Sequence, residues 1–285
     1  MAKRKPARTS GTKRFQLFRP VPKGFDAEKA TPKELRRYGI PLRPDPIRAP
    51  GLTAIWDRSV RRYRDFEHLQ ASITPGNLVL DPIAPALGLF PREACGFELT
   101  SFNAPFTILS GRWVVPNLHH GSLRAGTIFF RTFFALGFLD VHVEMTVDPG
   151  QNVTSRVTLG PGAQVNLPVR PGDWMNVMLC LQTNPAGTAA FFLTNETTRQ
   201  RTNFSIDTGL PPAVTISAGI SRGVTQNPLN PLADFGTVYF DELSAFTTSG
   251  TRLLVDGTAT SIVDNGVTLA RPVRLNDFAF RIDHA

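Results

Sequence analysis

Apolar and polar residues alternate along much of the second half of the chain, a pattern typical of β-strands whose two faces meet different surroundings. The stretch 169–198 shows the alternation most clearly. Residues 184–187, Asn-Pro-Ala-Gly, form a turn signal in its middle, and residues 188–193 lead back as a second apolar strand. The stretch predicts a hairpin at the centre of a sheet, with these apolar residues of its first strand on one face: Met175, Val177, Leu179 and Leu181.

Short runs of strand character continue from residue 97 to the end of the chain, separated by turns that contain Gly and Pro. No run is followed by a helical pattern, which excludes a parallel sheet with alternating helices. This many short strands predicts an all-β fold, an antiparallel β-sandwich of two sheets. Besides the hairpin, the expected strands are residues 97–101, 106–115, 127–135, 139–147, 153–159, 165–169, 203–206, 213–220, 236–246, 253–256 and 267–282.

Two helices are expected ahead of the strands. Thr31 and Glu34 flank Pro32 in the pattern of a capping box, and Gly39 and the prolines after it end this short helix. A second helix is expected after Thr53. Its apolar stripe is predicted to pack on the main domain, and it consists of Ile55, Trp56, Val60, Tyr63 and Phe66.

Positive charge is concentrated at the N-terminus. The formal net charge is +8, and enough Lys and Arg residues precede the first acid, Asp26, to account for the whole excess. Residues 1–24 are therefore predicted to be a flexible basic arm that contacts nucleic acid at most weakly and without sequence preference. The remainder divides into a helical and extended leader at 25–95, with a Pro- and Gly-rich linker at 71–93, and a β-sandwich at 96–285.

Composition excludes several classes of protein. The basic N-terminus has no apolar segment that would make it a signal peptide, and no apolar run reaches the ~18 residues that a membrane-spanning helix needs. Cys95 and Cys180 are the only cysteines, which indicates buried free thiols rather than a disulfide framework. We expect a cytoplasmic protein without a cofactor.

Four segments stand out by their order along the chain: Ser110-Gly-Arg-Trp-Val-Val-Pro116, Pro171-Gly-Asp173 with the hairpin after it, Pro231-Leu-Ala-Asp-Phe-Gly-Thr-Val-Tyr-Phe240, and the leader at 22–41. In this order they resemble the glutamic peptidases, the eqolisin family, over roughly residues 15–246. The resemblance implies a concanavalin-like β-sandwich with two long, curved antiparallel sheets. This fold agrees with the pattern of strands.

The resemblance also implies a catalytic dyad, in which a glutamate acts as general base on a water and a glutamine stabilises the oxyanion. Asp140 occupies the glutamine position, where an ionised carboxylate offers no hydrogen to donate. Ser221, or Ala218 in another register, occupies the glutamate position. The chain has no Gln in residues 71–150 and no Glu in residues 198–239, so we expect both members of the dyad to be missing.

Asp140, His142 and Glu144 alternate along one expected strand, so their side chains share one face. Together with Ser221 they are the candidate binding residues, and a solvent-facing strand edge is the alternative interpretation. The pair His119-His120 could join His142 and Glu144 as metal ligands only in a spacing that fits no standard zinc pattern, so no metal site is predicted.

Residues 219–223, Gly-Ile-Ser-Arg-Gly, match the nucleophile-elbow pattern around Ser221. An elbow requires a helix directly after the turn, and the Asn- and Pro-rich residues that follow cannot begin one. The pattern therefore indicates a serine in a glycine-flanked turn.

Three functions stay open. The preferred one is a non-catalytic eqolisin-like protein that binds a peptide or another extended ligand on its concave face. The second is an acid endopeptidase with a rearranged dyad that uses Asp140. The third is a self-assembling, capsid-like structural protein, because jelly-roll capsid subunits also carry a basic arm ahead of a β-sandwich. Neither the ligand nor the oligomeric state follows from the sequence.

Overall fold

A computed structural model of the chain describes residues 14–74, 92–121, 126–160, 163–183, 186–207, 211–222 and 231–285. Within these ranges an 11-stranded sheet forms the outer layer of the molecule. Its main path runs in the order β1-β12-β11-β10-β5-β14-β19-β18-β17, with β2 beside β12 and β15 beside β14. The strands are β1 (Arg14–Leu17), β2 (Glu67–His68), β5 (Phe106–Val114), β10 (Trp174–Thr183), β11 (Ala186–Asn195), β12 (Gln200–Asp207), β14 (Thr237–Thr247), β15 (Gly250–Arg252), β17 (Ile262–Asp264), β18 (Val267–Asn276) and β19 (Ala279–His284).

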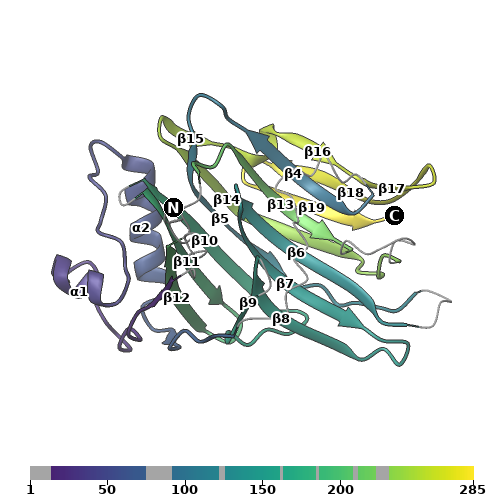
Figure 1. Ribbon diagram of the computed structural model, residues 1–285, viewed down its shortest axis with the longest axis horizontal. Helices are drawn as coiled ribbons and strands as arrows, with labels where there is room; N and C mark the ends of the chain where they lie inside the picture. The colour runs from purple at the N-terminus through teal and green to yellow at the C-terminus, as the bar shows by residue number, and fades with distance from the viewer. Residues whose placement is uncertain are drawn as a thin grey trace, which may run out of the picture.

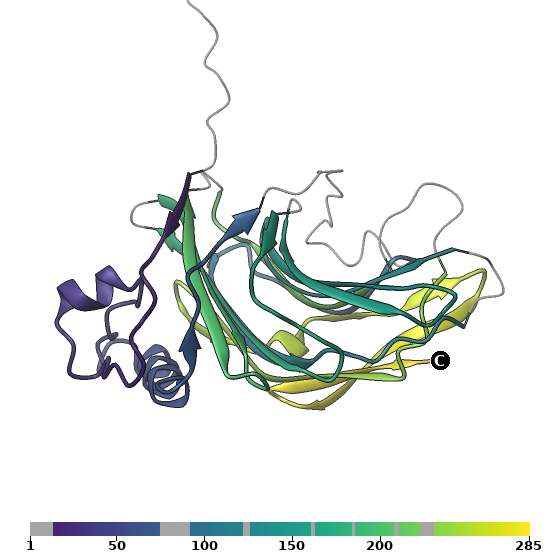
Figure 2. The ribbon, with the colours of Figure 1, turned by 90° about the horizontal axis from the view of Figure 1, so that it is seen from below.

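An 8-stranded sheet forms the inner layer in the order β16-β4-β13-β6-β7-β8-β9-β3. Figure 2 shows two curved layers nested one inside the other, so that the inner sheet has a concave face turned away from its partner. The strands of the inner sheet are β3 (Ile73–Thr74), β4 (Ala94–Thr100), β6 (Ile128–Leu136), β7 (Leu139–Val147), β8 (Val153–Leu159), β9 (Ala163–Val165), β13 (Thr215–Ser221) and β16 (Thr258–Thr260).

Aromatic side chains fill the core between the two sheets. Trp113 of the outer sheet packs against Phe134 of the inner sheet with ring centroids 5.1 Å apart, and its indole N–H donates to the Thr132 hydroxyl at 2.8 Å. Phe240 and Phe280 stack at 4.5 Å. The predicted antiparallel β-sandwich with two curved sheets is therefore confirmed; among the described strand pairs only β2 and β12 run parallel.

The hairpin predicted at the centre of a sheet is β10 and β11. β10 pairs with β11 on one side and with β5 on the other, which places it inside the outer sheet. As expected from the alternation, the four apolar residues of one face are buried in the core: Met175, Val177, Leu179 and Leu181.

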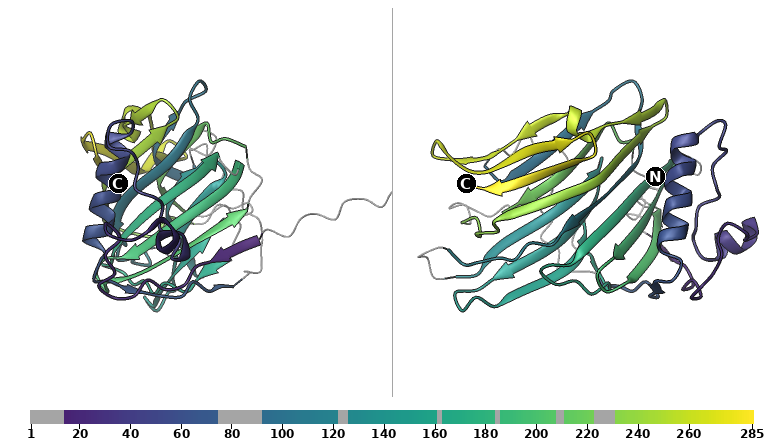
Figure 3. Two further views of the ribbon diagram at one scale, coloured as in Figure 1. Left: turned by 90° about the vertical axis from the view of Figure 1, so that its left-hand side faces the viewer. Right: turned by 180° about the vertical axis from the view of Figure 1, so that it is seen from behind.

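Both expected helices are present, α1 (Pro32–Arg37) and α2 (Pro50–Arg62). The capping box forms as predicted, because the Thr31 hydroxyl accepts from the Glu34 backbone N–H and the Glu34 carboxylate accepts from the Thr31 backbone N–H. Figures 1 and 3 show α2 against the outer face of the outer sheet, beside β10 and β12. None of the described helices is long and apolar enough to cross a membrane.

The structure differs from the sequence-based expectation in several segments, among them residues 267–282, expected as one strand, which form the antiparallel pair β18 and β19 with a turn between them. Residues 14–17, placed in the flexible arm, form β1 against β12, because the alternation around Phe15 and Leu17 suits a sheet edge. Residues 1–13 lie outside the described residues, as do 75–91 of the expected linker. Residues 254–256, expected as a strand, form a 3₁₀ turn (η2, Leu254–Asp256) in which Leu254 and Val255 are both buried, which a two-residue period cannot achieve. The expected strand 165–169 ends at Val165, as part of β9.

Candidate functional site

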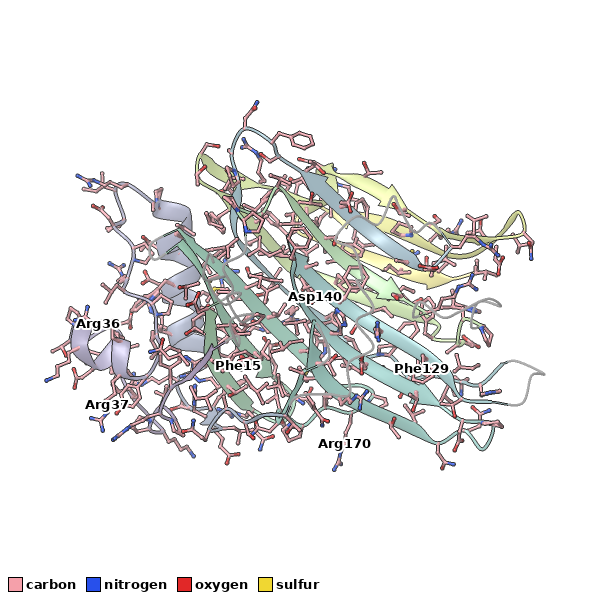
Figure 4. The ribbon with its side chains drawn as sticks, viewed as in Figure 1. Phe15, Arg36, Arg37, Phe129, Asp140 and Arg170 are labelled. Atoms are coloured by element: carbon pink, nitrogen blue, oxygen red, sulfur yellow. The ribbon has the colours of Figure 1, made fainter. Side chains whose placement is uncertain are left out.

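The predicted polar row lies on an inner strand of the smaller sheet. β7 pairs with β6 on one side and with β8 on the other. Since the alternate residues of β7 are buried in the core, Asp140, His142 and Glu144 share the opposite, concave face. Figure 4 marks Asp140 near the middle of the molecule. The interpretation of this row as a solvent-facing strand edge is wrong, because strands cover both sides of β7.

Asp140 and His142 form a buried pair. The His142 Nε2 and Asp140 Oδ2 atoms are 2.8 Å apart, and the side chains are only 6% and 11% exposed. Gly160 comes so close to this pair that a Cβ on it would collide with the Asp140 carboxylate, so glycine is required there. When the neutral ring donates from Nε2 to the carboxylate, its Nδ1 is a hydrogen-bond acceptor on the concave face.

Glu144 is held in an ion-pair row rather than left free. It lies directly opposite Arg131 on β6 and Arg156 on β8. One carboxylate oxygen is 3.0 Å from an Arg131 nitrogen, and the other is 2.8 Å from Arg156. With both oxygens bound to guanidinium groups, Glu144 is poorly placed to accept a proton from a water.

The register of β13 decides which of its residues lies level with Asp140. Ser217 is opposite Ala135 of β6, and Ala135 is opposite Asp140, so these three side chains form one row across the concave face. Ser221 shares that face but lies one row further than His142, level with Arg131 and Glu144. Ala218, the alternative position, is buried in the core. The position that faces Asp140 across β6 is thus Ser217, which the sequence reasoning missed.

Among the described residues of this face, three buried polar atoms have no hydrogen-bond partner. They are Asp140 Oδ1, Thr158 Oγ1 and Ser217 Oγ. Thr158 lies directly opposite His142 on β8, so all three side chains belong to the rows of Asp140 and His142. Because buried polar groups in folded proteins are nearly always satisfied, such a cluster indicates a place where a polar ligand or water completes the hydrogen bonds.

The other patterns gain no support from the geometry. Among the described residues no group of three or more His, Cys, Asp and Glu side chains is placed to hold a metal ion. His120 Nε2 lies 2.7 Å from the Gly126 carbonyl oxygen, away from Asp140. Ser221 is a residue of β13, paired with both β4 and β6, which is not the sharp turn of a nucleophile elbow. The end of that pattern, Gly223, lies outside the described residues.

Sequence comparison places this architecture in a family. A family model described as the Peptidase A4 family matches residues 92–277, well over half of the chain. The chain belongs to the Peptidase A4 family. This membership confirms the predicted resemblance to glutamic peptidases for the sandwich, whereas the matched residues do not include the leader at 22–41. A comparison with curated protein sequences finds no match.

Solved structures agree with this membership in the Peptidase A4 family. Scytalido-glutamic peptidase, in a complex with a transition-state analog inhibitor, is similar with a TM-score of 0.54 and 14% identity over 68% of this chain and 98% of that one. SCP-B, an eqolisin solved with the tripeptide Ala-Ile-His, gives a TM-score of 0.53 with the same identity and coverage. At this identity the likeness shows a shared fold.

Proposed function

We propose that this Peptidase A4 family chain binds an extended peptide on the concave face of its inner sheet and does not hydrolyse it. The observation that carries the proposal is the row of Ser217, Ala135 and Asp140 across β13, β6 and β7. Continued onto β4, where Glu98 lies opposite Ser217, this row carries two carboxylates and no side-chain amide, whereas the family's chemistry needs a base and an amide that donates to the oxyanion.

Two acids of β7, Glu144 and Asp140, are both engaged by basic side chains. Glu144 lies two residues along β7 and is bound by Arg131 and Arg156. The Asp140 carboxylate holds the ring of His142. A carboxylate that orients a histidine is a positioning group, and the donor that the row offers is the Ser217 hydroxyl rather than the amide of the family's chemistry.

The same face is suited to binding. The unpartnered atoms of Asp140, Thr158 and Ser217 offer a carboxylate and two hydroxyls to the N–H and C=O groups of an extended backbone. Phe129, on the same face of β6, is 47% exposed and offers an apolar surface to a peptide side chain. SCP-B, whose fold this chain shares, was solved with the tripeptide Ala-Ile-His.

One observation favours a second candidate, an acid-acting endopeptidase that uses Asp140. The buried Oδ1 atom of Asp140 has no partner in the structure, so it could hold a water for attack on a peptide bond. Within the row of Ser217 and Asp140, this candidate has the Ser217 hydroxyl as its oxyanion donor in place of an amide.

Two measurements on the same sample separate the candidates. Binding of the tripeptide Ala-Ile-His is followed by NMR, and cleavage of denatured casein between pH 2 and pH 7 by mass spectrometry. The test variant is Asp140→Asn, which keeps the size of the side chain and removes its charge. The matched control is Asp277→Asn, a side chain that is 60% exposed and pairs with Arg274 between β18 and β19.

We expect the unaltered protein to bind the tripeptide and to leave casein intact. The Asp140→Asn variant should bind about tenfold more weakly, because a hydrogen bond to a charged group is lost, and Asp277→Asn should bind normally. Cleavage that disappears in Asp140→Asn and persists in Asp277→Asn would establish the endopeptidase. Equal tripeptide binding by all three proteins would refute a binding role for Asp140.

A further inference from the structure

A second pocket lies on the opposite side of the molecule from the concave face. It is enclosed by the leader and α2 on one side and by the outer face of β10, β11 and β12 on the other (Figures 1 and 3). It contains about 730 Å³ of space between atoms, including its opening to solvent. Much of its wall is apolar, formed by Phe25, Ile40, Trp56, Val60, Met178 and Phe192.

The polar wall of this pocket is formed by three neighbouring side chains. β2 pairs with β12 so that His68 lies opposite Arg201, and Asn203 lies two residues further along the same face of β12. Each of the three has a fully buried atom without a hydrogen-bond partner: His68 Nδ1, Arg201 Nε and Asn203 Oδ1. The Asn203 amide nitrogen is already bound to the Tyr38 and Gly39 carbonyl oxygens, at 2.9 and 3.1 Å. The orientation of the amide is therefore fixed, and its oxygen faces the ring of His68, whose pKa it raises, although the two atoms do not reach good hydrogen-bond geometry.

The charge of the pocket is positive and uncompensated. None of the described residues that line the pocket is Asp or Glu. Arg64 and Arg201 both line it. Arg64 lies 3.9 Å from Asp26, and Arg201 forms no ion pair with any described carboxylate. Burial lowers the pKa of Arg201 to about 10, so this guanidinium is still protonated at neutral pH. A buried cation without a counter-charge is costly, which indicates that an anion belongs beside it.

Glu196, an acid on the same side of the sheet, is already engaged by other groups. Glu196 accepts a hydrogen bond from the Tyr63 hydroxyl at 2.7 Å and pairs with Arg62 at 2.9 Å and Arg112 at 3.3 Å. It serves to fasten α2 to the sheet. Among the described residues Arg201 therefore has no carboxylate partner, and a ligand could supply the counter-charge.

We propose that this pocket binds a small organic acid with an apolar body, whose carboxylate pairs with Arg201 and accepts from His68. The Asn203 oxygen, which faces the His68 ring without a well-formed hydrogen bond, can also accept from a hydroxyl or N–H donor next to that carboxylate. The apolar body lies against Trp56 and Phe192, which line the facing walls of the pocket. Two sources have this chemistry: a free α-hydroxy acid, and the C-terminal residue of an apolar peptide.

The probes are chosen to test each feature of the ligand. Phenyllactate carries the carboxylate, the adjacent hydroxyl and an apolar ring; phenylacetate lacks the hydroxyl, and phenyllactamide lacks the charge. The tripeptide Gly-Gly-Phe represents the peptide source. Binding is measured by calorimetry to the full chain and to two variants, Arg201→Met and the control Arg271→Met. Arg271 is an exposed arginine on β18, at the other end of the outer sheet.

We expect phenyllactate or Gly-Gly-Phe to bind, and the tighter of the two identifies the source. Removing the charge of either partner, in phenyllactamide or in Arg201→Met, should weaken binding about tenfold or more, and phenylacetate should bind more weakly than phenyllactate. Arg271→Met should bind like the unaltered protein.

A readout on the unaltered protein keeps the test valid if Arg201→Met does not fold. Burial, with a smaller contribution from the charge of Arg201, lowers the pKa of His68 to about 4. A bound carboxylate must raise that pKa, which NMR of the histidine side chains measures directly. The proposal is overturned if neither probe binds at about 1 mM, if Arg201→Met binds as well as Arg271→Met, or if bound phenyllactate leaves the pKa of His68 unchanged.

Discussion

Glu196 is the acceptor that fastens the leader to the sandwich, and replacing it should loosen α2. The variant Glu196→Gln keeps the shape of the side chain and leaves one oxygen to accept from the Tyr63 hydroxyl, now 2.7 Å away. It removes the charge that pairs with Arg62 and Arg112. The Glu196 side chain is only 11% exposed, so solvent screens these pairs poorly.

The size of the expected loss in stability depends on which ion pairs Arg62 and Arg112 keep in the variant. A hydrogen bond to a charged group contributes about 1.5–3 kcal/mol. Arg62 keeps a second carboxylate, Glu242, at 2.8 Å, and Arg112 keeps the same residue at 3.4 Å. The loss should therefore be closer to that of one such bond than of two, at about 2 kcal/mol in the free energy of unfolding, with a fall of several degrees in Tm.

Urea unfolding measures the free energy, and hydrogen exchange of the α2 amides measures whether the helix itself is loosened. The matched control is Glu28→Gln, because Glu28 pairs with Arg61 at 2.6 Å but both side chains are exposed, at 37% and 67%. That control should change stability by less than about 0.5 kcal/mol. A Glu196→Gln protein as stable as Glu28→Gln, with α2 amides exchanging as in the unaltered protein, would refute the assigned role.

Three further predictions address the core, the second pocket and the dyad. Phe134→Ala should lower the free energy of unfolding in urea by about 3–5 kcal/mol, because Phe134 is fully buried. The control Phe138→Ala, at a side chain that is 64% exposed, should lower it little, and equal losses for the two variants would place Phe134 outside the core. His68 has a folded pKa of about 4 against 6.5 for the free side chain, so the unfolded state binds more protons between these values and stability should fall as the pH drops from 6.5 to 4, by up to about 3 kcal/mol. His68→Gln should lose this pH dependence, and an unchanged dependence would contradict the assignment. The double variant Asp140→Gln with Ser217→Glu should place an amide and a carboxylate in one row and produce casein cleavage at acid pH. The control, Asp140→Gln with Ser221→Glu, should not cleave casein. Cleavage by the control and not by the first variant would contradict the register.

Strand alternation was enough to predict most of the sandwich. The strands at 139–147 and 153–159 agree with the sequence-based limits, because each has one apolar and one polar face and a clear turn at both ends. The strand predicted at residues 254–256 was wrong, because a single 3₁₀ turn there buries adjacent apolar residues that resemble a short strand in the sequence. β1 was missed because the charge around residues 14–17 outweighed their short alternation.

The candidate site was only partly predictable. That Asp140, His142 and Glu144 share a face follows from their spacing, and the structure places them so. Which residue of β13 faces Asp140 depends on the register of two strand pairings, and no local sequence signal reports that register. Ser217 and Thr158 were therefore missed, although each occupies a polar position between apolar core residues that could have drawn attention to it.

The second pocket could not be predicted from the sequence. Arg201 and His68 are 133 residues apart along the chain, and only the pairing of β2 with β12 brings them together. The apolar stripe predicted for the second helix was only partly right, because α2 ends at Arg62 and its Trp56 and Val60 pack against the leader residues Phe25, Leu35 and Ile40. That α2 also encloses a charged guanidinium depends on the leader's path.

A crystal structure of the chain grown with the tripeptide Ala-Ile-His tests the central claim most directly. We predict an intact peptide lying across β13, β6 and β7, with its backbone bound to the Asp140 carboxylate and to the Ser217 and Thr158 hydroxyls. A peptide cut beside Asp140, or one bound only away from the concave face, would contradict it.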